Sequence, residues 1–255
     1  MDDNIDRPSY EPEPAQPPTP APGAKYGSMQ RLWMMFTSPA EVFADIGIKP
    51  TWVLAMVILV IVGIGAQLVI MPHMDTEATI RESLEKRGTD LSDAQLEKAV
   101  EQAGKFAKFA PIIGLVIAPI MWAIMAAVFF LMLKIVGSDA DYSRSLSTTL
   151  YGYWPPTLVA LVLTSVLVQR LGKVPQEELA NVVKANLGAF MSADAPAWLL
   201  AVGSTISIFN IWAVVLLTIG FSAVGKISMA KAAVVTLVPW GAWIVVRAAF
   251  AAVTA

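Results

Sequence analysis

WVLAMVILVIVGIGAQLVIM, residues 52–71, is the stretch of sequence that decides the fold of this chain. Gln67 is its only polar side chain. An α-helix needs about 20 consecutive apolar residues to cross about 30 Å of hydrocarbon, and this stretch has that length. The sequence therefore predicts a membrane-spanning helix from Trp52 to Met71.

Four further apolar segments have a similar length. They are Phe109–Leu133, Tyr151–Gln169, Trp198–Phe221 and Ala230–Ala252. The third is the least regular, because Pro155 and Pro156 suit the start of a helix, so we expect a short regular helix with an irregular beginning. The predicted fold is an all-α integral membrane protein, a bundle of five transmembrane helices.

The composition agrees with a membrane location and excludes several other classes of protein. Of the 255 residues 56% are hydrophobic and only 15% are charged, whereas a soluble domain is about one quarter charged. The net charge of −2 argues against a nucleic-acid partner. Without cysteine there is no disulfide and no thiolate metal site. The expected partner is the lipid bilayer, with other membrane proteins as further candidates and the oligomeric state open.

The first 27 residues differ from the rest of the chain. They are acidic and rich in proline and offer almost nothing apolar to bury, so we expect a disordered tail over residues 1–27 and one membrane domain over 28–255. No basic start with an apolar run is present, so we expect no cleaved signal. The positive-inside rule favours neither orientation. We expect a cytoplasmic N-terminus, because the polar tail would otherwise need to be translocated.

A short amphipathic segment precedes the first span. Ser38, Pro39 and Glu41 have the pattern of an N-cap, an N1 proline and a capping box, and Gly47 is a helix stop. Bulky apolar side chains such as Phe43 suggest a helix that lies in the headgroup layer or docks on the bundle. The alternative is an ordinary connecting helix.

Two connections between spans are long. Met74–Lys108 predicts helices over Thr76–Arg87 and Ser92–Phe106, the second opened by a capping box of Ser92 and Gln95. Pro175–Ser192 has apolar residues at helical spacing. Alternating spans place both connections on the same side of the membrane, so we expect two helical loops on one face.

Two short motifs resemble a known family. FTSPAEVFADI, residues 36–46, is similar to the P-x-x-x-F-x-x-I segment that precedes the first span of the Yip-one (Ypt/Rab-interacting protein) domain family, and LYGYWPP, residues 150–156, is similar to its G-Y-x-x-P motif. Together with the span order they resemble the bacterial branch of that family. The resemblance implies a non-enzymatic, five-span protein of the bacterial plasma membrane with a cytosolic N-terminus. The D-L-Y-G-P-like signature of the eukaryotic, Rab-binding members is absent before Trp52, so that role is not carried over.

The spans offer no constellation for catalysis. They contain neither Asp nor Glu, which excludes intramembrane aspartyl chemistry and a carboxylate proton relay. His73 is the only histidine, so Ser204 has no base on any span and a metal site is not expected. Gly203 and Ser207 are better explained as a helix-packing pair. We expect no enzyme activity, no cofactor and no metal.

A few residues are candidates for functional contacts. Arg247 lies inside an apolar run, and either snorkels to the interface or pairs with Asn210 or a lipid phosphate. Prolines free backbone carbonyls at membrane depth. The best such region comprises Tyr151, Gly152, Tyr153, Pro155 and Pro156. The first hypothesis is a scaffold or adaptor that organises lipids or partner proteins, and the alternative is a transporter or channel subunit for an uncharged or lipid-like solute.

Overall fold

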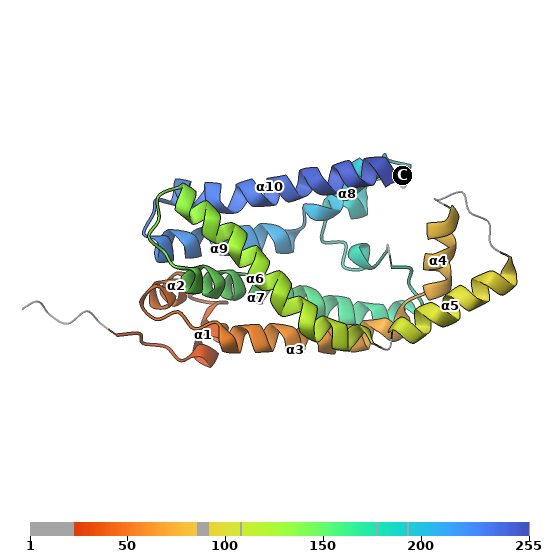
Figure 1. Ribbon diagram of the computed structural model, residues 1–255, viewed down its shortest axis with the longest axis horizontal. Coiled ribbons are helices and arrows are strands. Elements are labelled where there is room, and N and C mark those ends of the chain that lie inside the picture. The colour runs from red at the N-terminus through yellow and green to blue at the C-terminus, as the bar shows by residue number, and fades with distance from the viewer. Residues whose placement is uncertain (1–22, 86–91, 108, 177, 193, 255) are drawn as a thin grey trace, which may run out of the picture.

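The protein is a bundle of long helices with short helices at both ends (Figure 1). The computed structural model describes residues 23–254 except 86–91, 108, 177 and 193. The helices are α1 (Ser28–Met34), α2 (Pro39–Ile48), α3 (Val53–Ile70), α4 (Thr76–Glu85), α5 (Asp93–Ala107), α6 (Ala110–Ile135), α7 (Tyr142–Leu171), α8 (Ala197–Thr205), α9 (Ile208–Gly225) and α10 (Met229–Thr254). The described residues contain no β-strand. The tail predicted over residues 1–27 lies mostly outside the described residues.

Five helices are long and apolar enough to cross a membrane, which confirms the predicted fold class. They are α3 with the 3-10 turn Met71–His73 that follows it, α6, α7, α9 and α10. Proline lies inside α6, α7 and α10 without ending any of them. In such helices neighbouring groups take over the carbonyls that proline leaves without a partner.

The third span begins earlier than the sequence predicts. We expected Pro155 and Pro156 near the start of an irregular segment, but α7 runs unbroken from Tyr142 through both prolines. Asp141 caps it, accepting a hydrogen bond from the backbone N–H of Arg144. The first half of α7 buries serines and threonines in the bundle. The hydroxyl of Thr149 donates back to the carbonyl of Ser145, as helical threonines commonly do. These polar residues masked the helix start in the sequence.

The fourth apolar segment is two helices instead of one. The predicted Trp198–Phe221 span is broken at Ile206 and Ser207, between α8 and α9. The break is paired with the preceding loop: Leu187 N–H donates to the Ile206 carbonyl, and Ile208 N–H donates to the Ala185 carbonyl. Gly203 and Ser207 are therefore not one packing face of a continuous helix. Gly203 instead lets the loop backbone at Gly188 approach α8 closely.

Both long loops lie at one end of the bundle, as predicted (Figure 1). They are joined there, since Val174 N–H donates to the His73 carbonyl and Asp75 N–H donates to the Val174 carbonyl. Gln95 accepts a bond from the Ser92 N–H, as a capping box requires. The helices expected in Pro175–Ser192 are absent from its described residues, which form two 3-10 turns, Glu178–Asn181 and Leu187–Phe190. Pairing with the α8–α9 break replaces helical bonds in this loop.

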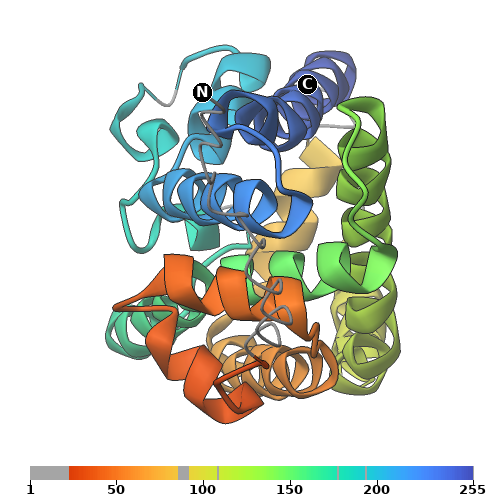
Figure 2. The same ribbon diagram turned by 90° about the vertical axis from the view of Figure 1, so that its left-hand side faces the viewer.

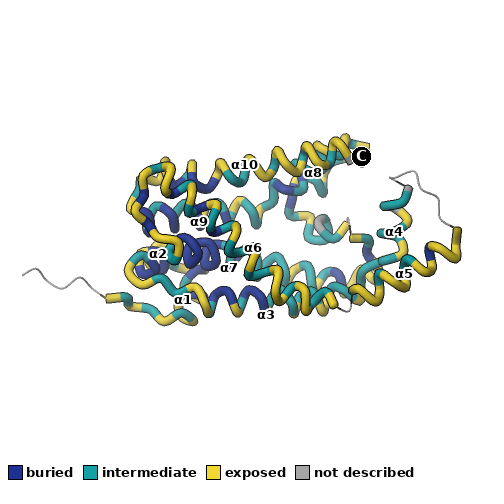
Figure 3. The backbone as a smooth tube through the Cα atoms, viewed as in Figure 1, coloured by how far each residue is buried: buried dark blue, intermediate teal, exposed yellow. Residues whose placement is uncertain are grey.

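The opposite end carries α1 and α2, which lie across the bundle (Figure 2). The buried residues gather at that end, around α2, α9 and the first half of α7, whereas α6 and α10 are largely exposed (Figure 3). Phe43 and Ile46 of α2 are fully buried in this core. Of the alternatives for the amphipathic segment, α2 therefore docks on the bundle. Ser38 precedes α2 as predicted, but its side chain makes no capping bond, and the helix continues past Gly47 to Ile48.

Candidate functional site

A buried ion pair locks α1 and α2 together. Arg31 and Asp45 are only 1% and 4% exposed, and Nη2 of Arg31 lies 2.7 Å from Oδ2 of Asp45. The guanidinium also donates to the carbonyl of Lys49 at 3.0 Å and to the hydroxyl of Thr51 at 2.6 Å. Since a buried charge is tolerated only when its hydrogen bonds are made, this network fixes α1, α2 and the beginning of α3 as one unit. We call residues 25–51 the collar.

The carboxylate of Asp45 also holds the chain that precedes α1. The backbone N–H groups of Lys25 and Tyr26 donate to it at 2.6 and 3.2 Å. Burial by itself raises the pKa of Asp45, but the bonds from Lys25, Arg31 and Tyr26 outweigh it, so the pKa lies below its usual 3.8. Asp45 is therefore a stable anion that accepts hydrogen bonds from three residues, two before α1 and one within it.

Two side chains of α7 fasten the collar to the spans. The indole Nε1 of Trp154 donates to the carbonyl of Leu32 at 3.1 Å, and the hydroxyl of Tyr151 donates to the carbonyl of Ser28 at 3.3 Å. Both side chains are buried. Tyr151 thus serves to attach α1 to the bundle.

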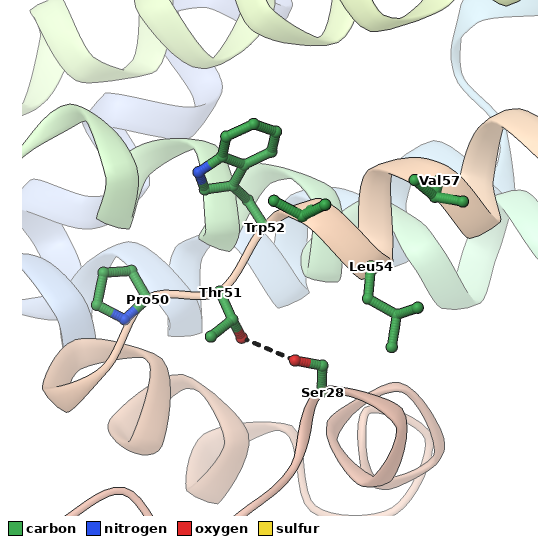
Figure 4. A pocket seen from close by; sticks show the side chains of 7 residues that line it. Ser28, Pro50, Thr51, Trp52, Leu54 and Val57 are labelled. Carbon is green, nitrogen blue, oxygen red and sulfur yellow. Dashed lines mark hydrogen bonds between the residues drawn. The ribbon is translucent and has the colours of Figure 1, made fainter.

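Between the beginning of α1 and the beginning of α3 lies a shallow cavity of about 450 Å³. Ser28 and Thr51 face each other there, their hydroxyl oxygens 3.3 Å apart (Figure 4). The rest of the wall is formed by Pro50, Trp52, Val53, Leu54 and Val57. Thr51 is already bound by Arg31. The polar groups of this cavity are used by the collar itself.

The other α7 candidates have different surroundings. Gly152 lies against Leu217 of α9, where an added Cβ would come within 2.7 Å of the leucine Cδ2. Pro155 and Pro156 are buried inside α7. Tyr153 contacts Trp122 of α6, with ring centroids 5.3 Å apart. Four residues of the expected cluster are therefore packed inside the bundle, and only Tyr153 lines a second cavity.

That second cavity, of about 510 Å³, brings together three predicted candidates, Tyr153, Asn210 and Arg247. Asn210 Nδ2 donates to the carbonyl of Thr205 at 2.8 Å, satisfying a group freed by the α8–α9 break. Arg247 lies 3.4 Å from the hydroxyl of Thr205. Asn210 and Arg247 thus both bind Thr205, and no direct bond between the two is found. We call this the membrane cavity.

Among the described residues no group of three or more acidic, histidine or cysteine side chains could hold a metal ion. The hydroxyl of Ser204 donates to the carbonyl of Ala201 at 3.0 Å, as a helical serine commonly does. The described surroundings of Ser204 on the membrane cavity include Arg247 and Asn210, and neither is a base.

Comparison with known proteins agrees with this architecture. The sequence model of the Yip1 domain matches residues 33–250, which is most of the chain. The chain belongs to the Yip1 family. No match was found among curated proteins or solved structures.

The two Yip1-like motifs coincide with packing positions of the bundle. Phe43 of the first motif meets Gly220 of α9, where an added Cβ would lie 2.8 Å from the ring and 2.6 Å from Cγ2 of Thr148. Gly152 of the second motif allows the same close approach at Leu217. In this Yip1 domain the motifs thus hold α2, α7 and α9 together.

Sequence reasoning missed the Arg31–Asp45 pair. The two residues are separated by fourteen positions and lie on different helices. The signal available was a charge inside each of two apolar runs, MQRLWM and VFADI. A charge at such a position has no solvated face to occupy and needs a buried partner.

Proposed function

We propose that this Yip1-family membrane protein is a non-enzymatic scaffold that organises lipids or partner proteins. The observation that carries the proposal is a rigid collar with an exposed apolar face. Met29 and Trp33 are 53% and 70% exposed although their neighbours Arg31 and Leu32 are buried. Spaced four residues apart, they lie on one face of α1.

The position of this face supports contact with lipid or protein. Trp52, at the beginning of the first span, is also exposed, and tryptophan is enriched where spans meet the headgroup layer. A surface residue that is apolar, aromatic and held in place loses little conformational entropy when it binds. The collar therefore has the properties of a preformed contact surface.

Crosslinking in native membranes tests this proposal. A photoreactive amino acid at position 33 is expected to give discrete adducts with a protein or with lipid. The matched control is position 106 on α5, where Phe106 is 72% exposed at the other end of the bundle. Equal, diffuse adducts at both positions would contradict the scaffold role. Deleting residues 1–22 and repeating the experiment shows whether the proline-rich segment contributes.

A second candidate, a transporter subunit for a lipid-like solute, is favoured by the membrane cavity beside the broken α8–α9 segment. Discontinuous helices at membrane depth line binding sites in transporters. The purified protein in liposomes is expected to give no solute flux as a scaffold. Saturable flux would decide for the transporter.

A further inference from the structure

The membrane cavity has an aromatic wall and a size suited to a ligand. Its volume of about 510 Å³ lies within the range of about 300–1,000 Å³ that is usual for ligand sites. Trp122 of α6, Tyr153 of α7 and Trp240 of α10 belong to its wall. An apolar chain would therefore be held on several sides.

The cavity opens on the outer surface of the bundle. Met121, Ile124 and Val128 of α6 line it and are exposed, as is Trp243 of α10, which also lines it. These residues lie within two spans, where the surrounding medium is hydrocarbon. An occupant can therefore enter from the bilayer without passing through water.

One end of the cavity carries a cation, Arg247, that forms no ion pair with any described residue. Among the described residues, the side chain of Arg247 bonds only to the hydroxyl of Thr205, at 3.4 Å. The helices α6, α7, α8, α9 and α10 contain neither Asp nor Glu. The C-terminus of α8 and the N-terminus of α9 meet beside Thr205, so their helix dipoles oppose each other there and the charge of Arg247 sets the sign of the potential. A cation at membrane depth is costly unless it is paired.

A second polar group of the cavity lacks a partner. The indole Nε1 of Trp240 is buried and has no hydrogen-bond acceptor in the described protein. Trp240 and Arg247 are seven residues apart on α10 and therefore lie on one helix face, about 10 Å apart along its axis. The cavity thus offers an apolar wall and a cation, and the Trp240 N–H lies buried in that wall.

We propose that the membrane cavity binds an anionic phospholipid. Its phosphate pairs with Arg247, and one acyl chain lies between α6 and α10 against the aromatic wall. The charge of Arg247 favours an anionic over a zwitterionic headgroup. This inference names the lipid class for the lipid-organising role proposed above and rests on that role.

A photoreactive lipid tests the assignment directly. The full chain is reconstituted in phosphatidylcholine nanodiscs that contain phosphatidylglycerol with a photoreactive acyl chain, and labelled peptides are mapped by mass spectrometry. Labelling is expected to concentrate on the cavity-lining parts of α6 and α10. Arg247→Gln should lower it at least fivefold. The matched control is Arg170→Gln, which removes an exposed arginine at the end of α7 away from the cavity.

Val128→Trp provides a variant that keeps the charge but fills the opening, and it should lower the labelling as well. Unlabelled phosphatidylglycerol should compete, whereas phosphatidylcholine and inorganic phosphate should not. The proposal would be overturned by equal labelling with photoreactive phosphatidylcholine, by uniform labelling of all spans, or by competition from inorganic phosphate. Such a failure is distinguishable from failure of the scaffold role, which is tested at position 33.

Discussion

Nη2 of Arg31 lies 2.7 Å from Oδ2 of Asp45, and this pair is buried where α1 crosses α2. The guanidinium extends the contact to Lys49 and Thr51 at the beginning of the first span. One ion pair thus joins three segments of the chain, and removing either partner leaves the other charge buried and unpaired.

Asp45→Asn should therefore destabilise the protein by about 3–5 kcal/mol, the usual cost of breaking a buried pair. Thermal unfolding in detergent measures the loss. The control is Glu77→Gln, which breaks the exposed Arg81–Glu77 pair of α4 and should cost at most about 1 kcal/mol. Equal effects of the two substitutions would contradict the structural role of Asp45.

The stability of the collar should decrease at acid pH. The pKa of Asp45 is lower in the folded protein than its usual 3.8, so the carboxylate contributes its full stabilisation above about pH 4–5. That stabilisation is lost as the pH falls through the folded-state pKa. The difference in melting temperature between the natural chain and Asp45→Asn should shrink between pH 6 and pH 3. A difference that stays constant over this range would rule out Asp45 as the group responsible.

Gly220→Ala tests the close approach of α9 to α7 and α2. The new Cβ would lie 2.6 Å from Thr148 Cγ2 and 2.8 Å from Phe43 Cε1, so we expect overpacking to cost about 1–3 kcal/mol. Gly63→Ala in α3, where no atom outside the neighbouring backbone of α3 lies within 4 Å of the added Cβ, is the control and should cause no loss. Melting temperatures in detergent compare the two variants.

Ser207→Ala tests the break between α8 and α9. The Ser207 hydroxyl accepts the backbone N–H of Asn210 at 3.1 Å and so caps α9. Its loss should cost about 1 kcal/mol and increase hydrogen exchange at the first turn of α9. Ser165→Ala, at a helical serine away from any break, is the control. Unchanged exchange at Asn210 would show that the cap does not hold the break.

The sequence predicted the spans, and the amphipathic segment before the first span, better than it predicted the contacts between helices. Apolar length alone identifies α3, α6 and α10, because lipid requires it. The same criterion joined α8 and α9, since Ile206 and Ser207 interrupt hydrogen bonding but hardly change the hydropathy. It also placed the start of α7 too late, because the buried serines and threonines look like a polar loop.

The candidate site shows the same division. Arg247 and Asn210 attracted attention as polar residues in apolar runs, and the structure places both on the membrane cavity. The capping box predicted at Ser38 does not form. The carboxylate of Glu41 instead accepts a hydrogen bond from the hydroxyl of Tyr26 at 2.8 Å. Contacts of this kind depend on which helices cross, which a linear pattern does not contain.

The hydrogen bonds that Asp45 accepts also bear on how the protein would respond to mechanical force. The chain leaving the bundle is held at Lys25 and Tyr26, and the same carboxylate is bound by Arg31, which reaches the first span through Thr51. Tension applied at the N-terminal side is therefore transmitted along hydrogen bonds to Thr51, just before α3. A second route runs through the hydrogen bond between Leu32 and Trp154 to α7. A pulling force on this end would therefore be shared by α3 and α7.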